Sequence, residues 1–314
     1  MTVRLPNGII DEMRRIMRGR IDVDVPLSRL TSFKIGGPAD VTAQPVDSED
    51  LACLLRYVRE RGISRILLGA GTNVLFRDEG FRGIVIGMTG IKAFEIRENG
   101  SGNALITVGA GTPLPSVINR ACAGGWTGLE SLWGIPGSFG GAIVTNAGSG
   151  GACIADFLET VRLLTPTGEE HLVGKPAIGY GYRRVDLPAG TAVTEGALTL
   201  PKGSAEIIEK NLERARTRRR SSQPHNRFSA GCVFKNPSSD RPAGAIIDRL
   251  GFKGITVGGA EVSPIHANFI VNNGNAMFSD VAALIERIRE SVRRHENVDL
   301  ELEIRIVGEE AYDV

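Results

Sequence analysis

The chain has 314 residues, with 37 Lys and Arg against 36 Asp and Glu, and therefore a formal net charge of +1. This balance creates no net field that would favour nucleic acid or an anionic membrane, so any anionic ligand has to be held by local groups. No apolar run approaches the roughly 20 residues that span a bilayer, and a signal peptide's apolar stretch is missing at the N-terminus. We expect a soluble, cytoplasmic protein of two or three subdomains, because the length exceeds that of most single cores.

The number and spacing of the glycines and cysteines narrow the possible kinds of binding site further. Glycine contributes 40 residues in clusters, which predicts many places where the backbone turns tightly or approaches a ligand, or else many short strands joined by turns. The four cysteines, Cys53, Cys122, Cys153 and Cys232, show no paired spacing of the metal-binding or redox kind. We therefore expect reduced thiols and no metal site.

The first quarter of the chain reads as the start of an α/β unit. A short helix is predicted around residues 9–18, and a short strand within residues 30–39 that ends at Gly-Gly-Pro. Asp47 or Ser48 caps the next helix, whose apolar positions share one face. A buried strand over residues 65–68 follows, which completes a βαβ-like pattern.

The loop Gly69-Ala70-Gly71-Thr72-Asn73 comes directly after that strand. Its unhindered backbone amides suit a pyrophosphate, although a plain turn is the alternative. It is not the dinucleotide fingerprint, since a third glycine and a helix are missing and residues 74–76 continue in strand-like residues. Residues 78–83 then close a predicted hairpin into a strand at residues 84–86.

Two more strands, at residues 93–96 and 104–108, precede a helix that begins with Thr112 as cap and Pro113 at its first position. The second glycine-rich block follows that helix and runs from Gly134 to Gly148. So many glycines beside hydroxyl and amide side chains favour a wall against a flat or phosphorylated cofactor over a purely structural loop.

Strands near residues 160–165 and 192–200 are followed by a helix that Ser204 caps. This helix runs into the basic residues 214–220. They lack interleaved aromatic residues, so a solvated helix end or a ligand-phosphate clamp is favoured over nucleic-acid binding. Composition changes here from glycine-rich strands to a mixed α/β pattern, which indicates a domain boundary.

The last part contains the stretch Ser229-Ala230-Gly231-Cys232-Val233-Phe234-Lys235-Asn236-Pro237, which places a thiol, an ammonium and a carboxamide between small residues and a proline. Such a stretch presents polar groups to a ligand, whereas the alternative is a buried cysteine beside an ordinary turn. We also expect a helix at residues 243–250, a strand at 268–271, a helix capped by Ser279, and a period-2 strand at 299–307 with a solvated polar face.

The order of these blocks resembles that of the UDP-N-acetylenolpyruvoylglucosamine reductase family over nearly the whole chain, in its shorter, type II form. The resemblance is carried by residues 31–39, 69–75, 134–142, Tyr182-Arg183, 229–237, 266–272 and 301–305.

This resemblance implies an α+β fold, with a two-subdomain FAD-binding (PCMH-type) α/β module and a C-terminal α/β substrate-binding domain. We expect FAD-binding subdomains at residues 1–90 and 91–203 and the substrate-binding domain at residues 204–314. The implied function is the NADPH-dependent, FAD-mediated reduction of UDP-N-acetylglucosamine enolpyruvate to UDP-N-acetylmuramate in peptidoglycan synthesis. The only implied partner is the small-molecule UDP-sugar; no nucleic acid, membrane or obligate protein partner is expected.

The resemblance also assigns roles to single residues. Arg183 and Glu303 would engage the substrate carboxylate and stabilise the enol-like intermediate, and Cys232 would donate a proton. Many relatives have serine at the position of Cys232, and a thiol is the stronger acid of the two. Relatives often have a serine where this chain has Val185, so we expect the local support of Arg183 to differ.

Cofactor and substrate contacts are implied in the same way. Non-covalently bound FAD would lie against Gly69, Ala70, Gly71, Thr72, Asn73, Gly134, Ile135, Pro136, Gly137, Ser138, Gly140, Gly141 and Ala142. The substrate would contact Asn236, Lys235, Gln223 and Arg227, whereas His266 is predicted to be structural and Glu301 to be solvated.

Two other functions fit parts of the pattern. The first is a flavin oxidase of the same architecture, many of which attach FAD through a histidine, but neither glycine-rich block contains one. The second is a UDP-sugar-binding or regulatory protein that has lost the flavin. Visible absorbance and titration with NADPH and substrate would separate these functions from the reductase.

Overall fold

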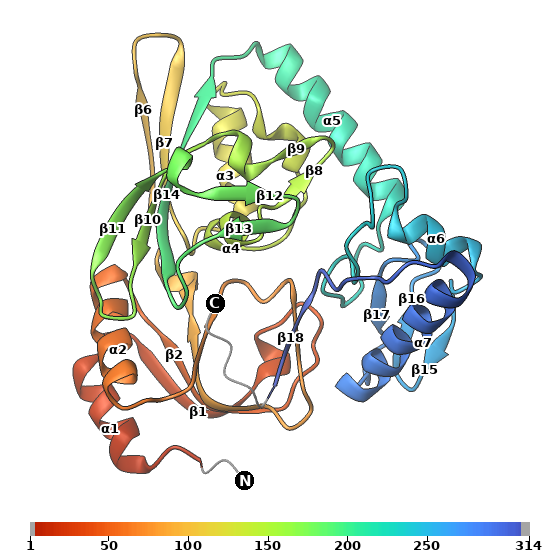
Figure 1. The fold of residues 1–314 in the computed structure, drawn as a ribbon. Helices are drawn as coiled ribbons and strands as arrows, with labels where there is room; N and C mark the ends of the chain where they lie inside the picture. Colours follow the sequence, from red (N-terminus) through yellow and green to blue (C-terminus); the bar gives the residue numbers. More distant parts are fainter. Residues whose placement is uncertain (1–3, 309–314) are drawn as a thin grey trace.

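A four-stranded sheet with the order β1-β2-β5-β3 forms the first part of the chain (Figure 1). The structure, a computed structural model, describes residues 4–308. Strands β2, β5 and β3 are parallel and β1 is antiparallel to β2. Apolar side chains of the two helices pack with this sheet into one core. The elements are α1 (Asn7–Ile16), β1 (Arg20–Pro26), β2 (Pro38–Gln44), α2 (Ser48–Glu60), β3 (Arg65–Leu68), β4 (Val74–Phe76) and β5 (Phe81–Gly87).

A five-stranded antiparallel sheet with the order β11-β10-β14-β7-β6 forms the second part. The helices α3 and α4 contribute to its core, in which Phe139 and Leu198 are fully buried. The elements are β6 (Phe94–Glu98), β7 (Asn103–Gly109), α3 (Leu114–Ala123), η3 (Leu129–Leu132), α4 (Phe139–Val144), β8 (Gly148–Ser149), β9 (Ala152–Cys153), β10 (Leu158–Leu164), β11 (Glu170–Gly174), β12 (Gly179–Gly181), β13 (Arg184–Asp186) and β14 (Ala192–Pro201).

A long helix, α5, leads from this sheet to a smaller α/β part (Figure 1). The chain then returns to the first part, where β18 pairs in parallel with β4, so that Arg305 lies opposite Val74. Phe33 and Leu75 of the first part are buried in the C-terminal core, which joins the two parts tightly. The elements are α5 (Ala205–Ser222), α6 (Ala243–Arg249), β15 (Thr256–Val257), β16 (Ala260–Val262), β17 (Ile270–Asn272), α7 (Phe278–Glu296) and β18 (Arg305–Val307).

Several predicted elements are confirmed, and their caps explain where they begin. The side chain of Asp47 accepts a hydrogen bond from the amide of Asp50 and caps α2, while Ser204 accepts from Ile207 and caps α5. Strand β3 covers the predicted residues. The strand predicted at residues 192–200 extends one residue further, to Pro201.

Two helix starts differ from the prediction. Helix α3 begins at Leu114, one residue later than predicted, and Thr112 does not cap it, because the Thr112 hydroxyl donates to the carbonyl of Ala93. Helix α7 begins before Ser279, and the carboxylate of Asp280 accepts from the amide of Met277 instead.

Three predicted strand features are wrong. Residues 30–37 contain no strand, because their backbone wraps around the first glycine loop, where the amide of Ser32 donates to Gly71. Strands β4 and β5 form no hairpin, since β4 pairs with β18. The predicted strand at residues 299–307 is reduced to β18, and residues before it make only an isolated bridge from Leu302 to Phe234.

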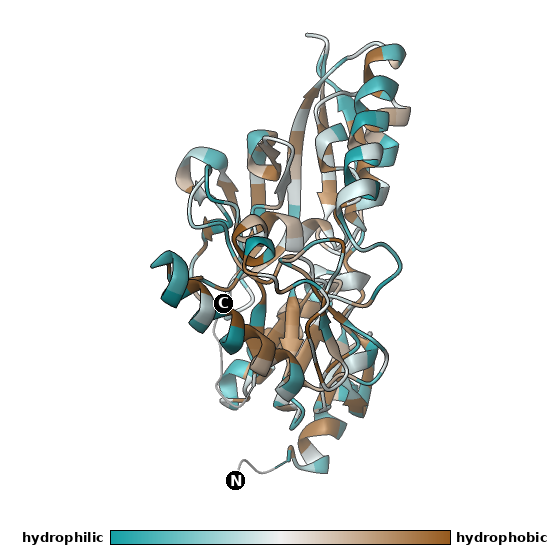
Figure 2. Cartoon of the chain, turned by 90° about the vertical axis from the view of Figure 1, so that its right-hand side faces the viewer, coloured by the Kyte–Doolittle hydropathy of each residue, from teal (hydrophilic) through white to brown (hydrophobic). Residues whose placement is uncertain are grey.

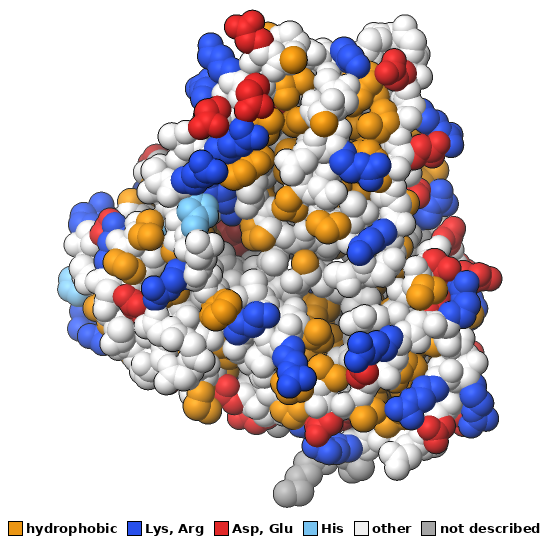
Figure 3. Space-filling model, turned by 180° about the vertical axis from the view of Figure 1, so that it is seen from behind, with side chains coloured by type: hydrophobic (Ala, Val, Ile, Leu, Met, Phe, Trp, Pro, Cys, Tyr) orange, Lys and Arg blue, Asp and Glu red, His pale blue; other side chains and the backbone are white. Residues whose placement is uncertain are grey.

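Hydropathy follows this architecture. The helices are hydrophilic on their outer faces, and hydrophobic residues gather between them and the sheets (Figure 2). On the face in Figure 3, basic and acidic side chains are interspersed rather than gathered in one patch, as the charge balance predicts. Within residues 4–308, no helix is long and apolar enough to cross a membrane.

Candidate functional site

The two glycine-rich loops predicted to bind a cofactor lie against each other. A Cβ atom added to Gly69 would lie 2.5 Å from Oγ of Ser138, and one added to Gly137 would lie 3.0 Å from Oγ1 of Thr72. A side chain at either position would crowd the opposite loop, and Gly137 also has a φ of +124°, which favours glycine. Residues 69–73 and 134–142 therefore form one continuous backbone surface, as the prediction of a shared cofactor site requires.

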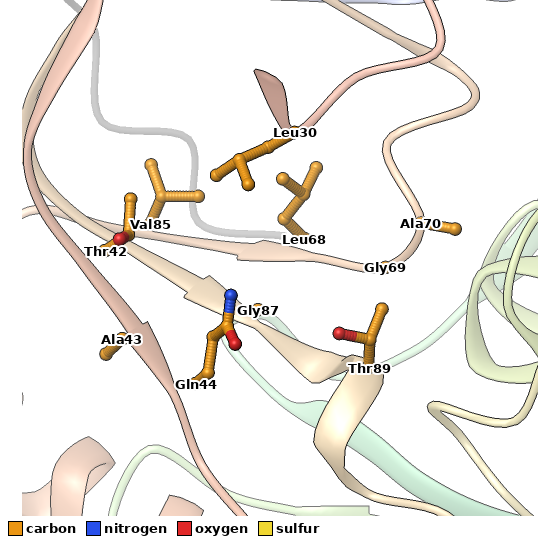
Figure 4. Close-up of a pocket in the computed structure, with 10 residues that line it drawn as sticks. All are labelled: Leu30, Thr42, Ala43, Gln44, Leu68, Gly69, Ala70, Val85, Gly87 and Thr89. Atoms are coloured by element: carbon orange, nitrogen blue, oxygen red, sulfur yellow. The ribbon is translucent and has the colours of Figure 1, made fainter. Parts of the chain in front are cut away.

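A mostly apolar cavity of about 260 Å³ opens beside the first loop. Leu30, Leu68 and Val85 line one side of it, and Gly69 and Ala70 lie at its edge (Figure 4). The cavity therefore extends the cofactor surface onto the first sheet.

Arg183 and Glu303, which lie far apart in the sequence, meet in the structure. Nε of Arg183 lies 2.7 Å from Oε1 of Glu303, and both side chains are largely buried. The Nε–H group is not directed at the carboxylate and has no hydrogen-bond acceptor, so the contact is an ion pair rather than a hydrogen bond. Nη2 of Arg183 donates to the carbonyl of Gly148 at 3.2 Å.

The backbone of Arg183 has a φ of +54°, in the left-handed region that non-glycine residues rarely adopt. It lies in the turn between β12 and β13, where the side-chain Nδ2 of Asn146 donates to the carbonyl of Gly181. This unusual conformation aims the guanidinium toward Glu303, and strained backbone of this kind is enriched at functional sites.

Cys232 lies beside this ion pair. The segment that contains it runs antiparallel to residues 301–303, since Glu303 donates to the carbonyl of Val233 at 2.8 Å and Lys235 donates to that of Glu301 at 2.9 Å. Burial, followed by the charge of Glu303, raises the pKa of the Cys232 thiol to about 12, although Arg183 and Arg219 oppose this effect. The thiol is therefore protonated at neutral pH, and the residue as a whole is half-buried.

Burial also raises the pKa of Glu303, while its ion pair with Arg183 and the more distant Lys235 oppose the rise. The site thus contains a protonated thiol, a carboxyl group that retains its proton more readily than in water, and a fixed cation. This combination can bind a carboxylate and deliver a proton to a carbon beside it.

The candidate substrate residues are only partly assembled around this site. Lys235 forms an ion pair of 3.2 Å with the exposed Glu301. The side-chain oxygen of Asn236 accepts from the amide of Ala243, where α6 begins, and the amide of Asn236 donates to Tyr182 at 3.4 Å. Both residues therefore lie on the segment that reaches Arg183.

Gln223 and Arg227 lie further along the same connection. Gln223 ends α5 and is half-buried. Arg227 is already bound, by an ion pair of 3.4 Å to Glu261 and a short hydrogen bond to Asn273. His266 behaves as predicted for a structural residue, because its Nδ1 accepts from the amide of Asn268 at 3.2 Å.

Two connections between the loops and the catalytic segments were not predicted. The side chain of Asn73 donates to the carbonyl of Glu303 at 3.1 Å, and the hydroxyl of Ser32 donates to the carbonyl of Ser229 at 2.6 Å. Ser32 belongs to a block that carried the resemblance, but nothing in its local pattern indicates a partner so distant in the sequence. The first loop therefore supports the Glu303 segment directly and the Cys232 segment through Ser32, whose amide donates to the carbonyl of Gly71.

The residues present fit FAD. The paired glycine loops offer close backbone approach for a pyrophosphate, and the apolar cavity offers space for a ring. Asn73 of the first loop also connects this surface to Glu303. Among residues 4–308, no group of three or more His, Cys, Asp or Glu side chains could hold a metal ion.

Comparisons with known proteins agree with this arrangement. Residues 39–174, which include both glycine loops, match a family model described as an FAD binding domain. Residues 223–307, which include Cys232 and Glu303, match the UDP-N-acetylenolpyruvoylglucosamine reductase C-terminal domain.

Individual relatives match over almost the full chain. A protein named UDP-N-acetylenolpyruvoylglucosamine reductase from Moorella thermoacetica is 40% identical and covers 96% of this chain and 98% of its own. One of the same name from Syntrophotalea carbinolica is 39% identical, with coverages of 94% and 96%. The solved structure of UDP-N-acetylenolpyruvylglucosamine reductase from Thermus caldophilus has a TM-score of 0.79 at 36% identity, and covers 92% of this chain and 99% of its own.

Proposed function

Since the chain belongs to the UDP-N-acetylenolpyruvoylglucosamine reductase family of flavin-dependent oxidoreductases, we propose that it reduces UDP-N-acetylenolpyruvoylglucosamine to UDP-N-acetylmuramate with NADPH. The reaction would serve peptidoglycan synthesis in the cytoplasm. The observation that supports this proposal most is the meeting of Arg183, Glu303 and Cys232 beside the joined glycine loops.

FAD, when bound, supplies the hydride that reduces the enolpyruvyl double bond. The chain's own residues have to hold the substrate carboxylate and complete the reduction with a proton. Arg183 binds that carboxylate, because its guanidinium is fixed by Gly148 and Glu303 and is shielded from water.

Cys232 donates the proton. The hydride adds to the terminal vinyl carbon, the thiol proton adds to the carbon that bears the ether oxygen, and the thiolate takes a proton from water. The net reaction consumes one NADPH and one proton. A thiol with a raised pKa is held protonated until a strongly basic carbon forms beside it.

Glu303 acts on the same intermediate. Since burial raises its pKa, the carboxyl group can hold a proton and donate a hydrogen bond to the enol-like oxygen as negative charge develops there. A fully ionised carboxylate would instead repel the substrate carboxylate, so the environment favours the role proposed for it.

We further propose that residues 1–90 and 91–203 hold FAD and that residues 204–314 bind the UDP-sugar. Two separate sheets with their own cores support the first division, and the matched C-terminal domain supports the second. Lys235 and Asn236 are proposed to contact the substrate, because their segment also contains Cys232. Gln223 is proposed as a further contact, and Arg227 would first have to release Glu261 and Asn273.

The test uses the FAD-loaded protein and its Cys232→Ala variant. We expect NADPH oxidation to depend on the enolpyruvyl UDP-sugar, and the variant to reduce the substrate roughly 100-fold or more slowly while NADPH still bleaches the flavin at the parent rate. Cys232→Ser retains a proton donor and should keep more activity than the alanine variant.

Cys53→Ala is the matched control, because Cys53 lies on α2, outside the proposed site, and its sulfur accepts a hydrogen bond from Arg56. Its substrate reduction should equal that of the parent. Substrate reduction by Cys232→Ala at the parent rate would exclude Cys232 as the proton donor. A protein that passes electrons to oxygen regardless of the UDP-sugar would be an oxidase, and a colourless one that binds the UDP-sugar would be a binding protein.

A further inference from the structure

One cation beside the catalytic residues is left without a counter-charge. Arg183 is paired with Glu303, Lys235 with Glu301 and Arg227 with Glu261. The half-buried guanidinium of Arg219, by contrast, makes no hydrogen bond or ion pair within residues 4–308. The mechanism above gives this arginine no role.

Arg219 lies between the second glycine loop and the thiol. A Cβ atom on Gly134 would lie 2.6 Å from Cδ and 3.0 Å from Nε of Arg219, so the side chain rests directly on the loop. Its charge also acts on Cys232, whose pKa it lowers against the effect of burial. The side chain therefore borders both the proposed flavin surface and the proton donor.

The position of Arg219 near the end of α5 distinguishes it from the other arginines of the basic run. The helix ends at Ser222, and the carbonyl of Arg219 accepts from the amide of Gln223 and contacts Nε2 of His225 at 2.9 Å. The neighbouring Arg218 points elsewhere: its Nη2 donates to Oγ of Ser149 at 2.8 Å, beside a separate hollow between α5 and η3.

Burial lowers the pKa of Arg219 to about 10, so the group remains charged at neutral pH although it is partly desolvated. An unpaired, partly desolvated cation is unfavourable unless an anion arrives during function. The proposed reaction creates one, because a hydride carries two electrons and one proton, and a neutral ring that accepts it gains one negative charge.

We propose that Arg219 binds the negative charge that FAD carries in its two-electron-reduced state, and thereby raises the reduction potential of the bound flavin. This proposal depends on the proposed function in one respect, namely that the cofactor is FAD. Arg183 is unsuited to this task, since its guanidinium is held by Glu303 and Gly148 and is assigned to the substrate carboxylate. A fixed positive charge near the ring favours the reduced state electrostatically, so hydride uptake from NADPH becomes easier.

The test measures the flavin without NADPH or UDP-sugar. Sulfite adds to N5 of oxidised flavin and places the same negative charge on the ring. In the FAD-loaded Arg219→Gln variant, we expect about tenfold weaker sulfite binding and a midpoint potential lower by about 30 mV, the equivalent of tenfold for a two-electron couple. Arg219→Lys should restore most of both, and Arg218→Gln should match the parent.

If Arg219→Gln binds sulfite as tightly as the parent and has the same midpoint potential, the proposal is wrong. A raised Michaelis constant for the UDP-sugar in that variant would then mean that Arg219 binds an anionic group of the substrate instead.

The parent holoenzyme provides a measurement that does not depend on a variant folding. Photoreduced at mildly acidic pH, it should show the absorption of the anionic reduced flavin, and the neutral form's spectrum would contradict the proposal. Because no substrate is used, a different substrate specificity would leave all these results unchanged.

Discussion

The buried carboxyl group of Glu303 affects both the stability of the fold and the proposed chemistry. Its side chain is 15% exposed, and desolvation outweighs the attraction of Arg183, so its pKa is raised. The folded protein therefore holds this proton more tightly than the unfolded chain does. The ionised group costs stability at neutral pH, and this cost disappears as the pH falls below about 4.3, the ordinary pKa of glutamate.

Glu303→Gln should therefore unfold at a higher temperature than the parent at neutral pH, and the two melting temperatures should converge near pH 4. Substrate reduction should fall roughly 100-fold or more, because the neutral amide of glutamine is a much weaker acid than a carboxylic acid and donates a weaker hydrogen bond to the developing negative charge. Melting curves across this pH range and steady-state rates test both statements.

Glu301→Gln is the matched control for this experiment, because Glu301 lies two residues away and its side chain is 76% exposed. It should shift neither the melting temperature nor its pH dependence appreciably. A lower melting temperature for Glu303→Gln at neutral pH would mean that the ion pair with Arg183 stabilises the fold, contrary to the direction of the pKa shift.

Glu301 and Glu303 illustrate which single residues a sequence pattern can predict and which it cannot. Alternation predicted a solvated polar face, and Glu301 fits it, but only the resemblance to a family separated Glu303 from its neighbour. The contact between Glu303 and Arg183 depends on the left-handed backbone of Arg183, which no local pattern indicates. Arg219 was noticed only as part of a basic run, because its lack of a partner is a property of the folded chain.

At the scale of elements, the glycine loops act by fitting together. Gly69 has no unusual φ, so its role is to leave room for Oγ of Ser138, which accepts from the amide of Gly141 and caps α4. The two loops approach each other closely here and again where Thr72 lies beside Gly137. A cofactor that spans both loops depends on their spacing.

Gly69→Ala should weaken FAD binding about tenfold, equivalent to about 1.4 kcal/mol, because the added methyl displaces the Ser138 hydroxyl. Adding Ser138→Ala should restore part of the affinity, since the nearest remaining atom, Cβ of Ser138, would lie 3.7 Å away. Quenching of FAD fluorescence on titration of the apoprotein measures both.

Gly8→Ala is the control, because a Cβ atom there meets nothing within 4 Å on α1. It should leave FAD affinity unchanged. Equal affinity in the parent and Gly69→Ala would show that the contact between the loops has no effect on the cofactor site.

Elements with strong local signals were predictable, and those defined by distant partners were not. Helices α2 and α5 have side-chain caps at the expected residues. The extent of the last strand depended on which residues find a partner. Residues 301–303 make only an isolated bridge to the segment around Phe234, whereas β18 pairs along its length with β4, which lies far away in the sequence. An alternating apolar pattern predicts which side chains are buried, but it does not predict which strands pair.

At the scale of the whole molecule, the C-terminal part is anchored on the first glycine loop. Three contacts meet there: Asn73 donates to the carbonyl of Glu303, the amide of Arg305 donates to the carbonyl of Asn73 at 2.9 Å, and Ser32 joins Gly71 to Ser229. A ligand that fixes the loop therefore also fixes the segments that carry Glu303 and Cys232. Cofactor binding and catalytic geometry are coupled through these contacts.

Hydrogen exchange should reveal this coupling. Addition of FAD to the apoprotein should slow exchange at residues 303–305 and 229–233, although they lie outside the two loops, because bound FAD restricts Asn73 and Ser32. Asn73→Ala removes one hydrogen bond, worth about 1 kcal/mol, and should reduce the protection of residues 303–305 about fivefold while that of residues 229–233 remains.

The β15–β16 hairpin shares the C-terminal core but lacks these contacts, so its exchange should stay constant. Uniform slowing of the whole C-terminal part, or none at residues 303–305, would show that the cofactor acts through global stability alone.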